Sequence, residues 1–196
     1  MLDEYDIQSM REHVAVAVLG GFEDEDQVRT WVERELGADD HALRDELTSH
    51  VAQLFREHRR REARWRKPTA NDAIDRAFDT LNERGIIALQ NPGYTLSDGW
   101  AEAHEAASAR PTPARGAVFY HRQDLECGVA GGGLMLAFGA FEDDLAKRDA
   151  AGMAVAQEVC DTLAGHGVRA TCDGTVHSRI EILPFAWRKR RWTTAS

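Results

Sequence analysis

Apolar side chains recur at helical spacing through the first third of the chain. In three successive stretches of residues 1–66 they lie three or four residues apart, as on the buried face of a helix. A typical set, from the first stretch, is Ile7, Met10, Val14 and Val18. Four acidic residues, 23–26, come where the second helix begins, and negative charge is favourable at a helix N-terminus. We therefore predict an acidic helical segment of three helices over residues 1–66.

After Pro68 the pattern changes to short apolar runs separated by helical stretches. The runs predict strands at 86–89, 117–120, 134–138, 168–172 and 180–182, the last two as an antiparallel hairpin. Helices are predicted between them at 71–84, 97–109, 123–130 and 143–164. The predicted fold is α+β, with the three-helix segment followed by a mixed four- or five-stranded sheet with packed helices. This α/β-type domain covers residues 67–196 and ends in a basic tail.

Charge is distributed in blocks along the chain. The net charge is −9, and residues 1–55 hold 14 acidic against 4 basic residues. Residues 56–67 reverse this balance with 7 basic and 2 acidic residues, and four more basic residues lie at 188–191. Because the acidic bulk repels phosphate, the sequence does not favour nucleic-acid binding. The partner is expected to be a small molecule or a protein, and the oligomeric state stays open.

Cysteine use and hydropathy predict a cytoplasmic protein. Cys127, Cys160 and Cys172 are scattered and cannot pair completely, which is typical of a reducing compartment. The longest uncharged apolar run, 128–141, is shorter than the roughly 20 residues of a spanning helix, so no membrane association is expected. The N-terminus has no basic start followed by an apolar core, so no secretory signal is predicted.

Phosphate-binding and metal-binding patterns are weak. The glycines 131–133 precede a predicted strand, whereas a phosphate loop needs a helix N-terminus after its glycines. The sequence contains neither a His-x-x-x-His pair nor a Cys-x-x-Cys pair. We therefore expect no metal and no cofactor.

Polar residues follow two of the predicted strands directly. If these strands run parallel, both loops meet at the same edge of the sheet, where ligands bind in open α/β sheets. The interpretation that competes with binding is that these residues cap helices and form turns. The candidate ligand-binding residues are Gln90, Asn91, Tyr94, Thr95, Ser97, Asp98, Tyr120, His121 and Gln123.

Three functions remain open at this point. The leading hypothesis is a non-enzymatic binding or regulatory module that uses the polar loops 90–99 and 120–124. The first alternative is a small hydrolase or transferase with His121 as general base, oriented by Asp98 or Asp124. The second alternative is a protein-interaction module that uses exposed tryptophans, with Trp31, Trp187 and Trp192 as candidates. The sequence does not decide whether the protein is an enzyme.

Six segments of the chain form recognisable motifs: Gly85–Thr95 (GIIALQNPGYT), Ser97–Gly99 (SDG), Phe119–His121 (FYH), Gln123–Leu125 (QDL), Val129–Leu134 (VAGGGL) and Asp173–Val176 (DGTV). Together they resemble a bacterial family of uncharacterised domains. The later Arg179-Ile180 and Trp187 fit the same pattern, and the resemblance covers residues 70–188 closely. In that pattern an alanine is common where this chain has Pro92, and a glycine is common where it has Arg122. The resemblance implies a family label without an activity.

Overall fold

The computed structural model describes residues 3–36 and 40–191. The chain forms two compact units, one of Met1–Thr69 with Arg188–Ser196 and one of Ala70–Trp187. We call them the helical unit and the α/β unit. Residues 188–191 therefore group with the helical unit although they follow the α/β unit in sequence.

Three helices form the helical unit, as the apolar spacing predicts. They are α1 (Glu4–Gly20), α2 (Glu25–Glu35) and α3 (His41–Glu62). Two of them begin with a capping box in which the cap side chain and the third helical residue satisfy each other's backbone N–H: Asp3 with Asp6 on α1, and Asp24 with Gln27 on α2. The acidic residues at these positions therefore help to start the helices.

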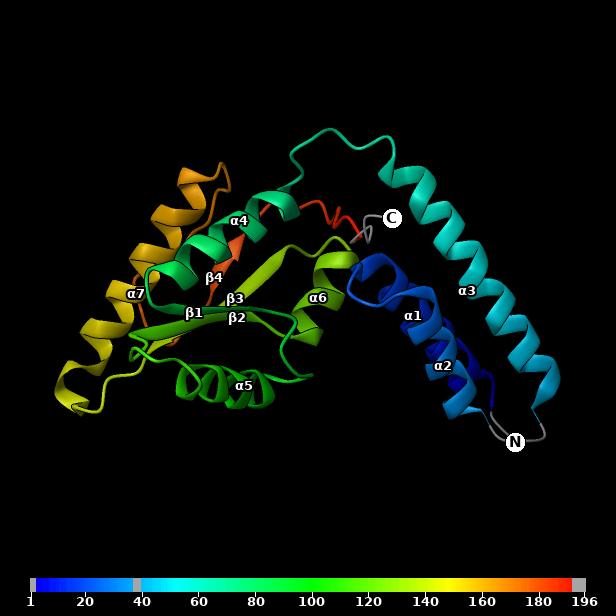
Figure 1. Cartoon of the computed structure of the whole chain (residues 1–196), viewed down its shortest axis with the longest axis horizontal. Helices are drawn as coiled ribbons and strands as arrows, with labels where there is room; N and C mark the ends of the chain where they lie inside the picture. The colour runs from blue at the N-terminus through cyan, green and yellow to red at the C-terminus, as the bar shows by residue number, and fades with distance from the viewer. Residues whose placement is uncertain (1–2, 37–39, 192–196) are drawn as a thin grey trace. The chain divides into compact units, whose positions relative to one another are not determined.

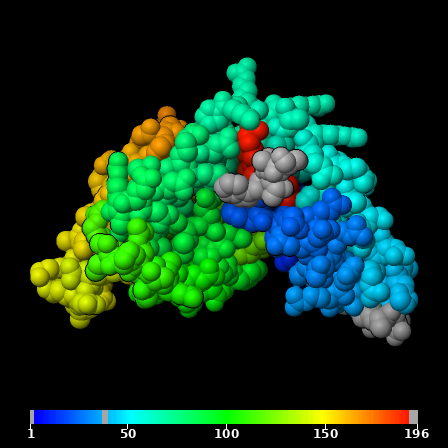
Figure 2. Space-filling view, viewed as in Figure 1, coloured from blue at the N-terminus to red at the C-terminus, as the bar shows by residue number. Residues whose placement is uncertain are grey.

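The apolar stripes of the three helices meet in one core. It contains Met10, Val14, Ala17, Val18, Val28, Val32, Leu36, Leu47, Val51 and Phe55. The basic residues at the end of α3 lie outside this core: Arg59, Arg60 and Arg61 are exposed. Long side chains of this segment project from the surface in the space-filling view (Figure 2). Positive charge at this end is favourable because a helix C-terminus carries partial negative charge.

A four-stranded mixed sheet forms the centre of the α/β unit. Its strands are β1 (Ile86–Gln90), β2 (Gly116–Tyr120), β3 (Leu134–Ala140) and β4 (Ile180–Ile182), in the order β1-β2-β3-β4. β1 and β2 are parallel, with Gln90 opposite Tyr120, and the other two pairs are antiparallel. The parallel arrangement of the first two strands is thus confirmed, and their carboxyl ends lie side by side.

Helices cover both faces of the sheet (Figure 1). α4 (Ala70–Glu83) and α7 (Leu145–Gly165) pack against each other and on one face, and α5 (Leu96–Ser108) packs on β1 and β2 from the other face. α6 (Arg122–Val129) directly follows β2 and packs on β3. No helix within residues 3–36 and 40–191 is long and apolar enough to cross a membrane.

The expected edge hairpin is reduced to one strand and a bridge. β4 forms at 180–182, but residues 168–172 contribute only a single antiparallel bridge between Thr171 and Glu181. Between them the Asp173 carboxylate accepts hydrogen bonds from the Thr175 N–H (3.0 Å) and the Ser178 hydroxyl (2.5 Å). The chain therefore closes into a compact polar turn here, and the ladder does not extend.

Candidate functional site

The loop after β1 lies directly over the first turn of α6. The Gly93 carbonyl accepts a hydrogen bond from the Arg122 N–H (3.1 Å), and the Tyr94 carbonyl accepts one from the Gln123 N–H (3.4 Å). These amides belong to the first turn of a helix, where no intrahelical carbonyl is available to them. The two predicted loops therefore come together, and backbone hydrogen bonds join them.

The loop conformation depends on left-handed backbone at two positions. Asn91 has φ +57° and Gly93 also has φ +57°. A Cβ atom on Gly93 would lie 2.2 Å from the Asp98 Cβ, so a side chain is excluded there by space as well as by backbone strain. Farther along, a Cβ on Gly99 would lie 2.3 Å from the Phe119 ring, so α5 packs directly on β2 at this glycine.

A capping box starts α5. The Thr95 hydroxyl accepts a hydrogen bond from the Asp98 N–H (3.3 Å), and the Asp98 carboxylate accepts from the Thr95 N–H (2.9 Å) and hydroxyl (2.8 Å). Hydrogen bonds from the Thr95 backbone and side chain lower the pKa of Asp98. Asp98 is therefore an ionised, exposed carboxylate held in one orientation.

His121 starts α6 in the same way. Its Nδ1 accepts a hydrogen bond from the Asp124 N–H (3.4 Å), and the Asp124 carboxylate accepts from the His121 N–H (3.1 Å). Arg179, from the segment before β4, donates to Asp124 Oδ1 (2.5 Å), and its Nη2 lies 2.9 Å from His121 Nε2. Arg179 thus joins His121 and Asp124, from which it is more than 50 residues away in sequence, in one polar cluster that we call the α6 cap cluster.

The environment of His121 favours a neutral ring engaged at both nitrogens. The residue is only 4% exposed. Burial lowers its pKa, Asp124 opposes this, and Arg179 adds to the lowering. Nδ1 faces the Asp124 N–H, and Nε2 lies 2.9 Å from Arg179 Nη2 and 3.3 Å from Asp124 Oδ2, so each ring nitrogen has a polar partner within the cluster. A general base needs a free nitrogen that faces substrate, and this geometry instead matches the work of a helix cap.

Gln90 and Tyr120 face each other across the parallel strands. The Tyr120 hydroxyl donates to Gln90 Oε1 (2.8 Å), and Tyr120 is 1% exposed. Burial raises the pKa of Tyr120 well above its usual value, so the hydroxyl stays protonated and acts as a donor. This pair ties the ends of β1 and β2 together below the loops.

The remaining predicted site residues point outward. Ser97, Asp98 and Gln123 are exposed, and Tyr94 is 52% exposed. Leu96, a residue that the sequence reasoning missed, is 42% exposed. An apolar residue placed between two helix-capping positions is the signal that would have found it. We call Tyr94, Leu96, Ser97, Asp98 and Gln123 the rim.

The candidate tryptophans are packed where they are described. Trp31 stacks on His13 with ring centroids 4.0 Å apart, and Trp187 contacts Tyr120 (5.9 Å) and Phe185 (5.8 Å) edge-on. Both indoles are partly buried. Trp192 lies outside the described residues.

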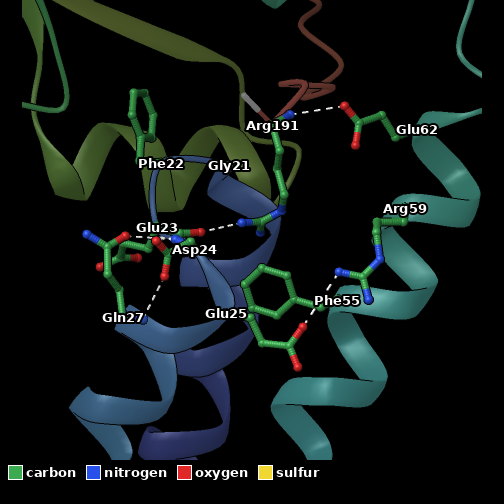
Figure 3. A pocket seen from close by; sticks show the side chains of 10 residues that line it. All are labelled: Gly21, Phe22, Glu23, Asp24, Glu25, Gln27, Phe55, Arg59, Glu62 and Arg191. Carbon is green, nitrogen blue, oxygen red and sulfur yellow. Dashed lines mark hydrogen bonds and ion pairs between the residues drawn. The ribbon is translucent and has the colours of Figure 1, made fainter. Parts of the chain in front are cut away.

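Each unit also contains a cavity that the sequence does not reveal. The cavity of the helical unit has about 450 Å³ and is lined by Gly21, Phe22, Glu23, Asp24, Glu25, Gln27, Phe55, Arg59, Glu62 and Arg191 (Figure 3). That of the α/β unit has about 580 Å³ and lies between α5 and the start of α7, with Trp100, His104, Phe141 and Arg148 in its wall. Within residues 3–36 and 40–191, no three His, Cys, Asp or Glu side chains are grouped so that they could hold a metal ion.

Comparison with known proteins places the chain in a family. An α+β protein with these capped loops matches a family described as a domain of unknown function (DUF6891), over residues 3–191. The chain belongs to this family. No curated protein and no solved structure matches it.

Replacing His121 tests its role as a helix cap. We expect His121→Ala to lower the free energy of unfolding by about 1–3 kcal/mol, because it removes the cap and leaves buried Asp124 and Arg179 with fewer partners. Asparagine is a good N-cap, so His121→Asn should recover roughly half of this loss. Urea denaturation measures both variants. Equal losses in the two variants would show that the imidazole ring does something other than capping.

A second buried histidine makes the helical unit sensitive to acid. His58 is 2% exposed, and its ring meets that of Trp65 edge-on at 5.4 Å. Burial lowers its pKa from 6.5 to about 4, and the positive charge of Arg191 adds to this. The neighbouring Lys189 backbone opposes the shift only in part.

The folded state therefore binds fewer protons than the unfolded state below pH 6.5. The stabilisation from neutral His58 is complete above pH 6.5 and is lost as the pH falls toward about 4. We expect the free energy of unfolding to fall by on the order of 2–3 kcal/mol over this window. His58→Leu replaces the ring with an apolar side chain of similar size that does not titrate. It should flatten the dependence of the free energy of unfolding on pH between pH 6.5 and 4. Parallel wild-type and His58→Leu curves between pH 6.5 and 4 would contradict this assignment.

Proposed function

We propose that the protein is a non-enzymatic binding or regulatory module, and that the polar loops 90–99 and 120–124 present the rim to a protein partner. The observation that carries this proposal is the exposure of Tyr94, in a loop whose backbone is hydrogen-bonded to α6, and of Leu96 at the start of α5. A partner supplies the concave surface in this arrangement, and the rim supplies the projecting side chains.

Rigidity of the loop favours binding. The carbonyls of residues 93 and 94 are bonded to α6, and Thr95 and Asp98 are bonded to each other. Side chains on such a frame lose little conformational freedom when a partner binds, so less of the contact energy is spent on ordering.

The composition of the rim resembles that of an interface centre with its border. Among the described residues, five large hydrophobic side chains are exposed, and two of them, Tyr94 and Leu96, lie on either side of the residue that caps α5. Ser97 and Asp98, which follow Leu96, and Gln123, whose N–H donates to the Tyr94 carbonyl, are exposed and polar. Tyrosine anchors ringed by polar groups are typical of residues that dominate binding energy.

The alternatives receive less support. The α6 cap cluster holds His121 in a buried position with both nitrogens engaged, which leaves the general-base hypothesis without a free group. Two of the three candidates of the tryptophan hypothesis, Trp31 and Trp187, are partly buried and packed on other rings, and Trp192 lies outside the described residues.

A photo-crosslinking amino acid placed at position 94 tests the proposal in the cells that make the protein. We expect one discrete protein adduct from position 94 and the same adduct from position 96. Position 145 is the matched control, because Leu145 is 75% exposed but lies on another helix, and it should not give this adduct.

Competition gives the experiment its specificity. Excess wild-type protein should suppress the adduct at least tenfold more effectively than excess Tyr94→Ala protein, with equal folding verified by circular dichroism. The proposal is overturned if positions 94 and 145 give the same adducts, or if Tyr94→Ala competes as well as the wild type.

A further inference from the structure

The last described residues of the chain lie along the helical unit as an irregular, peptide-like segment. Residues 188–191 have no helix or strand, and they belong to the helical unit although more than a hundred residues separate them from it in sequence. Three successive cations of this segment each meet an aromatic ring. Lys189 Nζ lies 4.7 Å from the Phe22 centroid, Arg190 Cζ 5.9 Å from that of Trp65, and Arg191 Cζ 4.0 Å from that of Phe55.

Carbonyl groups at the ends of two helices receive the same cations. Arg191 donates to the Val18 carbonyl in the last turn of α1 and to the Glu23 carbonyl after it. Arg190 donates to the carbonyls of Glu62 (3.4 Å), Trp65 (3.2 Å) and Arg66 (3.2 Å) at the end of α3. The last carbonyls of a helix lack partners within it and carry partial negative charge, so they attract cations. α1 has no basic residue of its own in its last turn, and Arg191 takes that place.

The backbone of the segment is also held. The Arg191 N–H donates to Glu62 Oε1 (3.0 Å). A Cβ on Gly21 would come within 3.2 Å of the Lys189 carbonyl, so a glycine here lets the segment approach closely. Rings, carbonyls and a carboxylate thus contact both the side chains and the main chain of a Lys-Arg-Arg sequence.

The cavity continues this surface beside Arg191. Figure 3 shows the Arg191 side chain reaching toward Glu23, with the Phe55 ring nearby and Arg59 turned to Glu25. The Arg59–Glu25 pair is long, at 3.6 Å, and partly exposed. The space of about 450 Å³ is lined by two phenylalanine rings and four acidic residues as well as by Arg59 and Arg191. Rings and carboxylates of this kind favour an alkyl stem with a cationic head.

We propose that the helical unit recognises a Lys/Arg-rich segment of a partner polypeptide at the surface that residues 189–191 contact here. This surface is formed by Phe22, Phe55, Glu62 and Trp65, and we call it the groove. The segment observed in the groove is itself a basic tripeptide, and residues 1–69, which hold it, carry 16 acidic and 11 basic residues, a net negative charge. The chain's own segment acts as a competitor, and a partner binds by displacing it. This proposal concerns the helical unit and does not depend on the rim.

Removing the three cationic side chains of residues 189–191, with the rest of the chain unchanged, tests the proposal. The triple variant Lys189→Ala, Arg190→Ala, Arg191→Ala removes the three cations, and circular dichroism verifies its fold. The probe is a fluorescein-labelled Gly-Arg-Lys-Arg-Arg-Gly peptide, read by anisotropy, and its control has glutamine at all four basic positions. We expect the variant to bind the basic peptide at least tenfold more tightly than the wild type does, with affinity that falls as salt rises. The glutamine peptide should not bind.

Two further variants localise the binding. Phe22→Leu, made in the triple variant, removes one ring and should weaken binding several-fold, whereas Glu46→Gln, on the exposed Arg11–Glu46 pair, should leave it unchanged. If the triple variant does not fold, Lys189→Gln alone removes the cation from the Phe22 ring and should raise the affinity for the basic peptide a few-fold over that of the wild type.

Four results would overturn the proposal. The first two concern the peptides: the folded triple variant and the wild type bind the basic peptide equally well, or the triple variant binds the glutamine peptide as tightly as the basic peptide. The third is that Glu46→Gln weakens peptide binding as much as Phe22→Leu does, and the fourth is that the wild type forms a dimer that the triple variant does not form. The last result would show that the segment of a second copy is the partner. Loss of rim crosslinking with intact peptide binding, or the reverse, separates this proposal from the one for the rim.

Discussion

The α/β unit is organised by backbone hydrogen bonds between the loop after β1 and the first turn of α6. A helix start has amides without intrahelical partners, and an irregular loop has carbonyls without ladder partners. Here the carbonyls of Gly93 and Tyr94 accept from the amides of Arg122 and Gln123. The loop therefore supplies acceptors for the amides of the helix, and the helix supplies donors for the carbonyls of the loop. Without the other segment, each would have unpaired backbone groups.

This constraint explains why residues 91–98 and 121–124 are rich in turn and capping residues. Asn91 and Gly93 supply left-handed backbone, and the Thr95–Asp98 and His121–Asp124 pairs start the two helices. These residues direct the loop carbonyls at α6. The groups left for recognition are the side chains that project from the frame, chiefly Tyr94 and Leu96.

Sequence reasoning predicts the elements well because their apolar periodicity is local. The three helices and the strands predicted at 86–89, 117–120 and 134–138 follow from it, and the structure has these strands at 86–90, 116–120 and 134–140. The parallel arrangement of the first two strands, on which the predicted site depends, does not follow from periodicity and is found in the structure. Sequence reasoning also brings His121 and Asp124 together, since they are three residues apart at a helix start. It does not bring in Arg179, which lies 55 residues from Asp124 and reaches it only through the path of β4.

The same limit applies to the helical unit. The charge blocks are visible in the sequence, but the contacts of 188–191 depend on where helix packing places Phe22, Phe55 and Trp65. A ring set assembled from a loop, a helix face and a helix end has no spacing signature. The sequence therefore predicts the candidate loops but not the groove, although both depend on backbone groups at helix ends that have no partner within the helix.

Amide hydrogen exchange at the start of α6 measures the central interaction most directly. Arg122 and Gln123 should exchange at least tenfold more slowly than Leu96 and Ser97, which occupy the same helical positions in α5 and for which no loop carbonyl is found in the described part of the chain. Equal, fast exchange at all four amides would contradict the account, because the loop would then not be bonded to α6.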